Sequence, residues 1–203
     1  MTASILYIHG LNSSPASHKA SQLSRAMARL DLASRLRVPA LHHHPRQAIA
    51  QLQALISELG APLLVGSSLG GYYATYLAEQ HGLKALLINP AVQPHLRFDG
   101  YLGPQKNYYS DETWDLTEDH VQALAELDVA PPSDPTRYQI WLQTGDETLD
   151  YRDAERYYRA CALRIQAGGD HGFQGFAERL PTLFAFAGIN ATLWRDTDFS
   201  AFN

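Results

Sequence analysis

A serine flanked by two glycines is the strongest chemical signal in the sequence. The run Gly66-Ser67-Ser68-Leu69-Gly70 follows an apolar stretch at 63–65 and precedes a segment with the apolar spacing of a helix. A serine on such a turn between strand and helix is held with its hydroxyl above the sheet, where it can attack a carbonyl carbon. The pattern predicts Ser68 as a nucleophile. Ser67 lacks the glycine spacing and is interpreted as a small residue lining the turn.

A histidine far along the chain can serve as the base for this serine. His171 lies in the glycine-rich run Gly168-Gly169-Asp170-His171-Gly172, after the last apolar stretch. A lone histidine in a loop is usually a solvated side chain. Here it follows both the serine and an acidic loop, and the carboxyl ends of parallel strands open on one edge of a sheet. We therefore expect His171 to reach Ser68.

The acid that orients this histidine should lie between the two residues. The run 145–150 reads Gly-Asp-Glu-Thr-Leu-Asp and follows the apolar stretch 138–142. Asp146 is nearest to the predicted strand end and is the expected partner, because a carboxylate on one ring nitrogen frees the other to take the serine proton. Asp150 is the main alternative. Asp170 is a weaker one, since a neighbour in sequence seldom folds back onto the same ring.

An acyl-transfer site also needs two backbone N–H groups to bind the oxyanion. The residue after the nucleophile, Leu69, supplies one of them. The other is expected from the loop that follows Ile8-His9-Gly10, with Leu11 as the first candidate and Asn12 as the next. His9 is interpreted as a residue that organises this loop rather than as a second base.

The elements that must position these residues can be predicted from apolar periodicity. The chain has 203 residues, 45% of them hydrophobic, and one domain spanning residues 1–203 is expected. Six apolar stretches predict strands, at 5–8, 36–41, 63–65, 85–88, 138–142 and 162–165. Segments with helical spacing separate most of them, and Pro45, Gly60 and Gly82 mark helix ends. This alternation predicts an α/β fold with a doubly wound, mostly parallel six-stranded sheet and helices on both faces.

One long segment, residues 93–135, interrupts this alternation and is called the insertion below. It contains no stretch that reads as a strand, but a helix-like stretch is expected from Glu118 to Leu127. An insertion of this length is usually a lid or binding loop, with a packed excursion over the sheet edge as the alternative. We predict that its aromatic side chains bind substrate, namely Tyr101, Tyr108, Tyr109 and Trp114.

Composition excludes several other classes of function. Lys and Arg number 16 against 21 Asp and Glu, for a net charge of -5, so the chain lacks the basic surplus that nucleic-acid binding usually needs. Cys161 is the only cysteine, and the first apolar stretch is too short for a signal peptide or a membrane span. We expect a cytoplasmic protein that acts on a small molecule rather than on nucleic acid or a membrane.

Three successive histidines, His42, His43 and His44, form the most unusual run in the sequence. Their side chains diverge and no carboxylate or cysteine stands at ligand spacing beside them, so a metal site is not expected there. Because they follow a predicted strand, we expect them to border the cleft instead.

The blocks named above resemble the α/β-hydrolase superfamily, and closely resemble its small bacterial YqiA-type esterases. The resemblance is carried by Tyr7-Ile8-His9-Gly10-Leu11-Asn12, Gly66-Ser67-Ser68-Leu69-Gly70-Gly71, Asn89-Pro90-Ala91, Gln143-Thr144-Gly145-Asp146-Glu147 and Gly169-Asp170-His171. It implies hydrolysis of short to medium acyl esters or of thioesters, without metal or cofactor, by a triad of Ser68, Asp146 and His171. Two other functions remain open: a non-catalytic ligand-binding protein with the same fold, and an acyltransferase that uses the same triad.

Overall fold

The computed structural model describes residues 4–203 of the chain, and a parallel sheet of six strands lies at its centre. Its strands are β1 (Ile5–Ile8), β2 (Leu36–Arg37), β3 (Leu63–Ser67), β4 (Ala85–Ile88), β7 (Tyr138–Gln143) and β8 (Ala162–Gln166). Their order is β2-β1-β3-β4-β7-β8, and every neighbouring pair is parallel. The predicted six-stranded parallel sheet is therefore confirmed.

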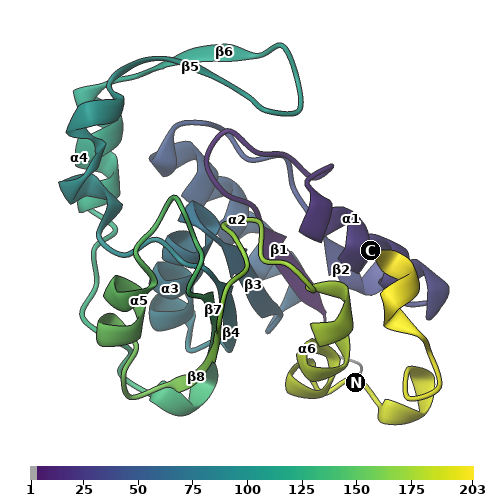
Figure 1. Ribbon diagram of the computed structural model, residues 1–203. Coiled ribbons are helices and arrows are strands. Elements are labelled where there is room, and N and C mark those ends of the chain that lie inside the picture. Colours follow the sequence, from purple (N-terminus) through teal and green to yellow (C-terminus); the bar gives the residue numbers. More distant parts are fainter. Residues whose placement is uncertain (1–3) are drawn as a thin grey trace.

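Helices cover both faces of this sheet (Figure 1). The helices that pack on the sheet are α1 (His18–Arg29), α2 (Pro45–Leu59), α3 (Leu69–His81), α5 (Tyr151–Tyr157) and α6 (Leu180–Ala187), while α4 (Glu118–Ala125) packs on α2. Pro45 is the first residue of α2 and Gly60 its C-cap, while Gly82 ends α3 in the left-handed conformation, as the sequence predicted. Within residues 4–203, no helix is both long enough and apolar enough to cross a membrane.

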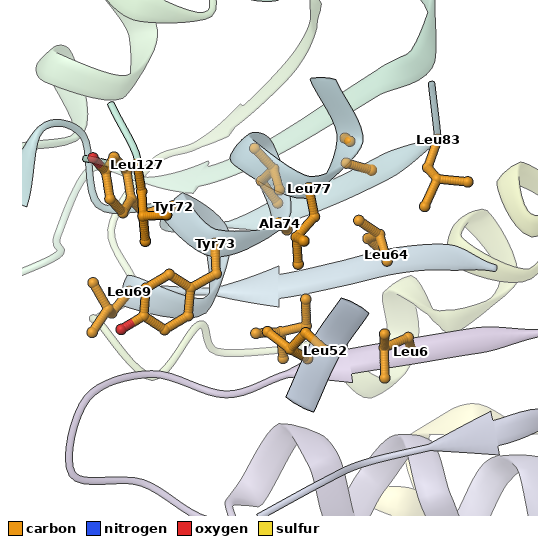
Figure 2. Packing of buried hydrophobic residues seen from close by; sticks show 14 of the residues in the cluster. Leu6, Leu52, Leu64, Leu69, Tyr72, Tyr73, Ala74, Leu77, Leu83 and Leu127 are labelled. Carbon is orange, nitrogen blue, oxygen red and sulfur yellow. The ribbon is translucent and has the colours of Figure 1, made fainter. Parts of the chain in front are cut away.

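Two separate cores follow from the alternation of side chains along buried strands. Leu6 and Ile8 of β1 point to one face, where they pack with α2 and α3, while Ile5 and Tyr7 point to the other and pack with α1 and α6. Figure 2 shows the first of these layers, with Leu52 of α2 close to Leu6. Because both faces are covered, the central strands read as continuous apolar runs.

One predicted strand is much shorter than expected. The stretch 36–41 contributes only the two residues of β2, which pair with β1 at the edge of the sheet. Pro39 has no backbone N–H and cannot extend the ladder. The chain then leaves the sheet and leads through the three histidines to α2.

The insertion contains strands that the sequence did not predict. β5 (Gly103–Lys106) and β6 (Thr113–Leu116) form an antiparallel hairpin, separate from the main sheet, and α4 follows it. Neither strand contains an apolar run. Apolar periodicity therefore could not predict these two strands. The helix-like stretch 118–127 is α4, which ends at Ala125. In Figure 1 the hairpin extends across the top of the molecule, above the loop that follows β1.

Candidate active site

Ser68 lies on a sharp turn between β3 and α3. Its backbone has φ 56° and ψ -124°, a region that residues other than glycine seldom adopt. A Cβ atom on Gly66 would lie 2.4 Å from the Gly70 carbonyl oxygen, and one on Gly70 would lie 2.0 Å from the carbonyl oxygen of Ile8. Both glycines are therefore needed for α3 to pack this closely against β3 and β1.

A continuous series of hydrogen bonds links Ser68 to a histidine and an aspartate. The Nε2 atom of His171 lies 3.0 Å from Ser68 Oγ, and its Nδ1 atom lies 2.8 Å from Asp146 Oδ2. Since a carboxylate only accepts, Nδ1 carries the hydrogen and Nε2 is free to accept the proton of the serine hydroxyl. The Asp146 side chain is almost fully buried, so water does not compete for this contact.

The two alternative acids have other partners. Asp150 begins α5 and accepts hydrogen bonds from the backbone and guanidinium of Arg152. Asp170 accepts from the side-chain amide of Gln174. Of the three aspartates considered from the sequence, Asp146 is the one placed against His171.

Three further residues hold the histidine loop, and the sequence analysis assigned them no role. Buried Asn89 donates from its amide to the carbonyls of residues 170 and 171 and accepts from the backbone of Gln143. The Oε1 atom of fully buried Gln143 accepts from the backbone N–H groups of residues 170 and 174. Glu147 accepts from the backbone N–H of His171. Their positions at or after the ends of β4 and β7, on the edge of the sheet where the candidate site lies, were the feature of the sequence that could have indicated this role.

The loop after β1 comes into direct contact with Ser68. A Cβ atom on Gly10 would lie 3.4 Å from Ser68 Oγ, so the backbone of this loop borders the Ser68 hydroxyl. The backbone N–H of Leu41 donates to His9 Nε2, which leaves His9 Nδ1 to donate to the Gly10 carbonyl oxygen at 3.0 Å. Burial lowers the pKa of His9 and favours this neutral ring. His9 therefore organises the loop, as expected.

The two expected oxyanion donors both border this site. Leu69 begins α3, where a backbone N–H has no acceptor within its own helix. Leu11 follows Gly10 in the loop beside Ser68. Within residues 4–203, neither of these N–H groups donates to another backbone oxygen.

A cavity of about 640 Å³ opens beside Ser68 and His171. The insertion contributes aromatic side chains to its lining, including Tyr101, Tyr108 and Tyr109, although all three are also substantially exposed. Trp114 is not among the lining residues of this cavity, contrary to the sequence expectation. Its indole instead donates to Asn12 and stacks on His43, which directs the ring away from the cavity.

A lysine lies beside the histidine loop. Lys19 lines the cavity, and its Nζ atom donates to the carbonyl oxygen of Gly172 at 2.8 Å. Burial lowers its pKa to about 8, against the opposing effect of the Asp170 and Asp146 carboxylates. The sequence did not indicate this basic side chain, whose charged form the two carboxylates favour.

The three successive histidines do not border the cavity, contrary to expectation. Their rings join a stack with Trp114 and His120 of the insertion, in which His43 lies 4.9 Å from Trp114 and His44 lies 4.5 Å from His120. Among the residues of the described range, no group of three or more His, Cys, Asp or Glu side chains is arranged to hold a metal ion. Ring contacts of the three histidines therefore hold the loop after β2 against the insertion.

Comparison with known proteins agrees with this architecture. The model of a family described as "Uncharacterised protein family (UPF0227)" matches residues 4–188. A UPF0227 protein of Shewanella baltica (strain OS185) is 33% identical over 193 residues, which cover 90% of this chain and 98% of the relative. A putative hydrolase from Agrobacterium vitis S4 superposes with a TM-score of 0.72 at 16% identity, over 92% of this chain and 88% of the other.

A second solved structure gives the same result. Est1E from Butyrivibrio proteoclasticus, with ferulic acid bound, has a TM-score of 0.63 at 12% identity and covers 91% of this chain and 86% of its own. Likeness at these identities establishes the fold alone. The chain belongs to the UPF0227 family and has the α/β-hydrolase fold.

Proposed function

We propose that this chain is a serine hydrolase that cleaves short to medium acyl esters, with thioesters as substrates of the same chemistry. The observation that carries the proposal is the hydrogen-bonded series from Asp146 through His171 to Ser68 Oγ, at the edge of a cavity large enough for a small substrate. The hydrolase, esterase and lipase names of its structural neighbours agree with it.

The reaction begins with attack by Ser68 on the substrate carbonyl carbon. As the new C–O bond forms, the hydroxyl proton moves to His171 Nε2, and Asp146 stabilises the resulting imidazolium. The negative charge that develops on the carbonyl oxygen is bound by the N–H groups of Leu11 and Leu69. The bond to the leaving alkoxide or thiolate then breaks, and His171 returns the proton to it.

The acyl-enzyme is released by water. His171 takes a proton from the attacking water molecule, the second tetrahedral intermediate uses the same two N–H groups, and Ser68 recovers its proton as the acid departs. All of these groups belong to the chain, so the reaction as proposed requires no metal or cofactor. The insertion is proposed to cover the acyl pocket, with Tyr101, Tyr108 and Tyr109 as its walls and Trp114 as a support outside it.

A fluorophosphonate probe tests the nucleophile directly, because it reacts only with an activated serine. We expect the wild-type protein to be labelled and Ser68→Ala to remain unlabelled. Ser67→Ala is the matched control, since it removes the neighbouring hydroxyl at the end of β3, and it should be labelled like the wild type. An unlabelled wild-type protein would support a non-catalytic binding role instead.

A further inference from the structure

Asn12 is tied to the hairpin β5–β6 by three of its polar atoms. Its side-chain Nδ2 donates to Oε1 of Gln105 at 3.0 Å, and its Oδ1 accepts from Nε1 of Trp114 at 2.9 Å. Its backbone oxygen accepts from the backbone N–H of Tyr108 at 2.8 Å. Both strands of the hairpin and the turn between them therefore converge on this one residue.

The backbone of Asn12 also needs external support. It has φ 53°, in the left-handed region, which asparagine tolerates better than most residues but still adopts at a cost. The next residue is held from the same side, because the amide of Asn107 donates to the carbonyl oxygen of Ser13 at 3.1 Å. Four hydrogen bonds from the hairpin thus fix two consecutive residues of the loop after β1.

This loop carries the Leu11 amide. The peptide between Gly10 and Leu11 is planar, so the direction of the Gly10 carbonyl sets the opposite direction of the Leu11 N–H. His9 holds that carbonyl from one side, and Asn12 fixes the chain immediately on the other side of Leu11. The Leu11 amide therefore lies between two fixed points of the chain. The hydrogen bond from His9 fixes the residue before it, and the hydrogen bonds from the hairpin fix the residues after it.

The hairpin itself is anchored away from the cavity. The Trp114 ring stacks on His43 at 4.9 Å with an interplanar angle of 19°, and it contacts His120 at the start of α4 at 5.2 Å. His43 precedes α2, which packs on the main sheet. The contacts thus run from the sheet layer through His43 and Trp114 to Asn12.

We propose that the hairpin β5–β6, acting through Trp114 and Asn12, positions the Leu11 amide that binds the oxyanion. The inference rests on the proposed function and adds Asn12 and Trp114 to it as positioning residues. A hairpin that swung open during each cycle would break all four hydrogen bonds to residues 12 and 13. The proposed role therefore requires the insertion to keep its place at this end during the chemical step.

Two variants separate this role from simple packing. Asn12→Gly keeps the left-handed backbone accessible but removes both side-chain hydrogen bonds. Trp114→Phe removes the indole donor and retains a ring that can stack on His43. Trp194→Phe is the matched control, because it deletes an indole hydrogen bond of similar length, 3.1 Å to the Ile189 carbonyl, outside the cavity lining.

The first measurement is the backbone amide signal of Leu11 in the ¹⁵N-labelled full-length protein. We expect it to shift or broaden in Trp114→Phe, a change remote from Leu11 in the sequence, and to remain unchanged in Trp194→Phe; Asn12→Gly alters the residue next to Leu11 and is therefore judged by its kcat. The second is the hydrolysis of p-nitrophenyl butanoate. Deleting one oxyanion donor outright costs roughly 10²–10³ in kcat in other hydrolases, so displacing one should cost roughly tenfold, with little change in KM.

The outcomes are distinguishable. An unchanged Leu11 signal in Trp114→Phe overturns the inference, as does a wild-type kcat in both variants. If the wild-type protein hydrolyses no ester while the Leu11 signal moves as expected, the positioning role stands and the proposed function fails. Should Asn12→Gly not fold, Trp114→Phe alone decides between these results.

Discussion

Ser68 has a backbone conformation that costs about 1–3 kcal/mol in residues other than glycine. Hydrogen bonds on both sides of the residue hold it there. Its N–H donates to the carbonyl oxygen of Ile88, and its own carbonyl oxygen accepts from the N–H groups of Gly71 and Ala91. Such conformations persist where surrounding structure fixes them and are frequent at active sites.

The sequence was sufficient to predict which three side chains come together, because each follows a strand whose carboxyl end opens on the same edge of the sheet. It was not sufficient to predict the roles of Asn89, Gln143 and Glu147. Their partners are backbone atoms of the loop 168–174, whose path depends on Gly168 and Gly169 with φ of 72° and 75°. A polar residue at a strand end does not reveal which backbone atoms a distant loop will bring to it.

The placement of Asp146 gives a prediction at this scale. Asp146→Asn should lower kcat for p-nitrophenyl butanoate far more than Asp150→Asn or Asp170→Asn, because an amide in place of the carboxylate favours the wrong tautomer of His171. The corresponding change in a serine protease costs roughly 10⁴-fold. Equal losses in Asp146→Asn and Asp150→Asn, at equal melting temperatures, would contradict the assignment.

Among the elements, predictions failed where packing rather than periodicity determines the structure. The strand expected at 36–41 ends at Arg37, because Pro39 has no backbone N–H with which to extend the ladder. The hairpin in the insertion was not predicted because its two strands have four residues each and contain no apolar run. Trp114 was assigned to the cavity as one of the aromatic residues of the insertion, but its indole N–H donates to Asn12 instead. Buried central strands such as β4 were predicted at their observed bounds.

The stack of imidazoles that anchors the insertion should respond to pH. The pKa values of His43 and His120 are lowered, first by burial and then by the neighbouring imidazoles, and acidic groups only partly oppose this. The groups around them on the adjoining elements are His42, His44, Arg46, Glu112, Asp119 and Glu126. The folded cluster therefore favours neutral rings.

The sign of the effect follows from linkage. Both folded pKa values lie below the ordinary value of 6.5, so the unfolded chain takes up protons first as pH falls. The contribution of these groups to stability is complete above pH 6.5 and is lost progressively as pH falls below it. We expect His43→Phe, which keeps a ring on Trp114 but cannot titrate, to flatten the fall in melting temperature between pH 7 and pH 5.

The matched control is His81→Phe, at the exposed end of α3. It removes an imidazole that lies outside the cluster, so it should flatten the fall in melting temperature less than His43→Phe does. The interpretation of the cluster is wrong if the two variants have the same slope.

At the scale of the whole molecule, the strand order explains why the site forms where it does. The chain runs from β1 outward to β2 and then returns to pair β3 with β1, so the loops after β1 and β3 lie side by side at the point where the order reverses. Ligands in open α/β sheets bind at such points, outside the carboxyl ends of the strands. β4 lies between β3 and β7, which brings the Asp146 loop to the same edge.

The most direct test of the account is to trap the covalent intermediate. Wild-type protein turning over p-nitrophenyl butanoate is quenched in acid within milliseconds, digested and analysed by mass spectrometry. We expect a butanoyl ester on Ser68, in the peptide that also contains Ser67, with fragment ions that place it on Ser68. Steady turnover with no acylated serine, or with the butanoyl group on another residue, would contradict it.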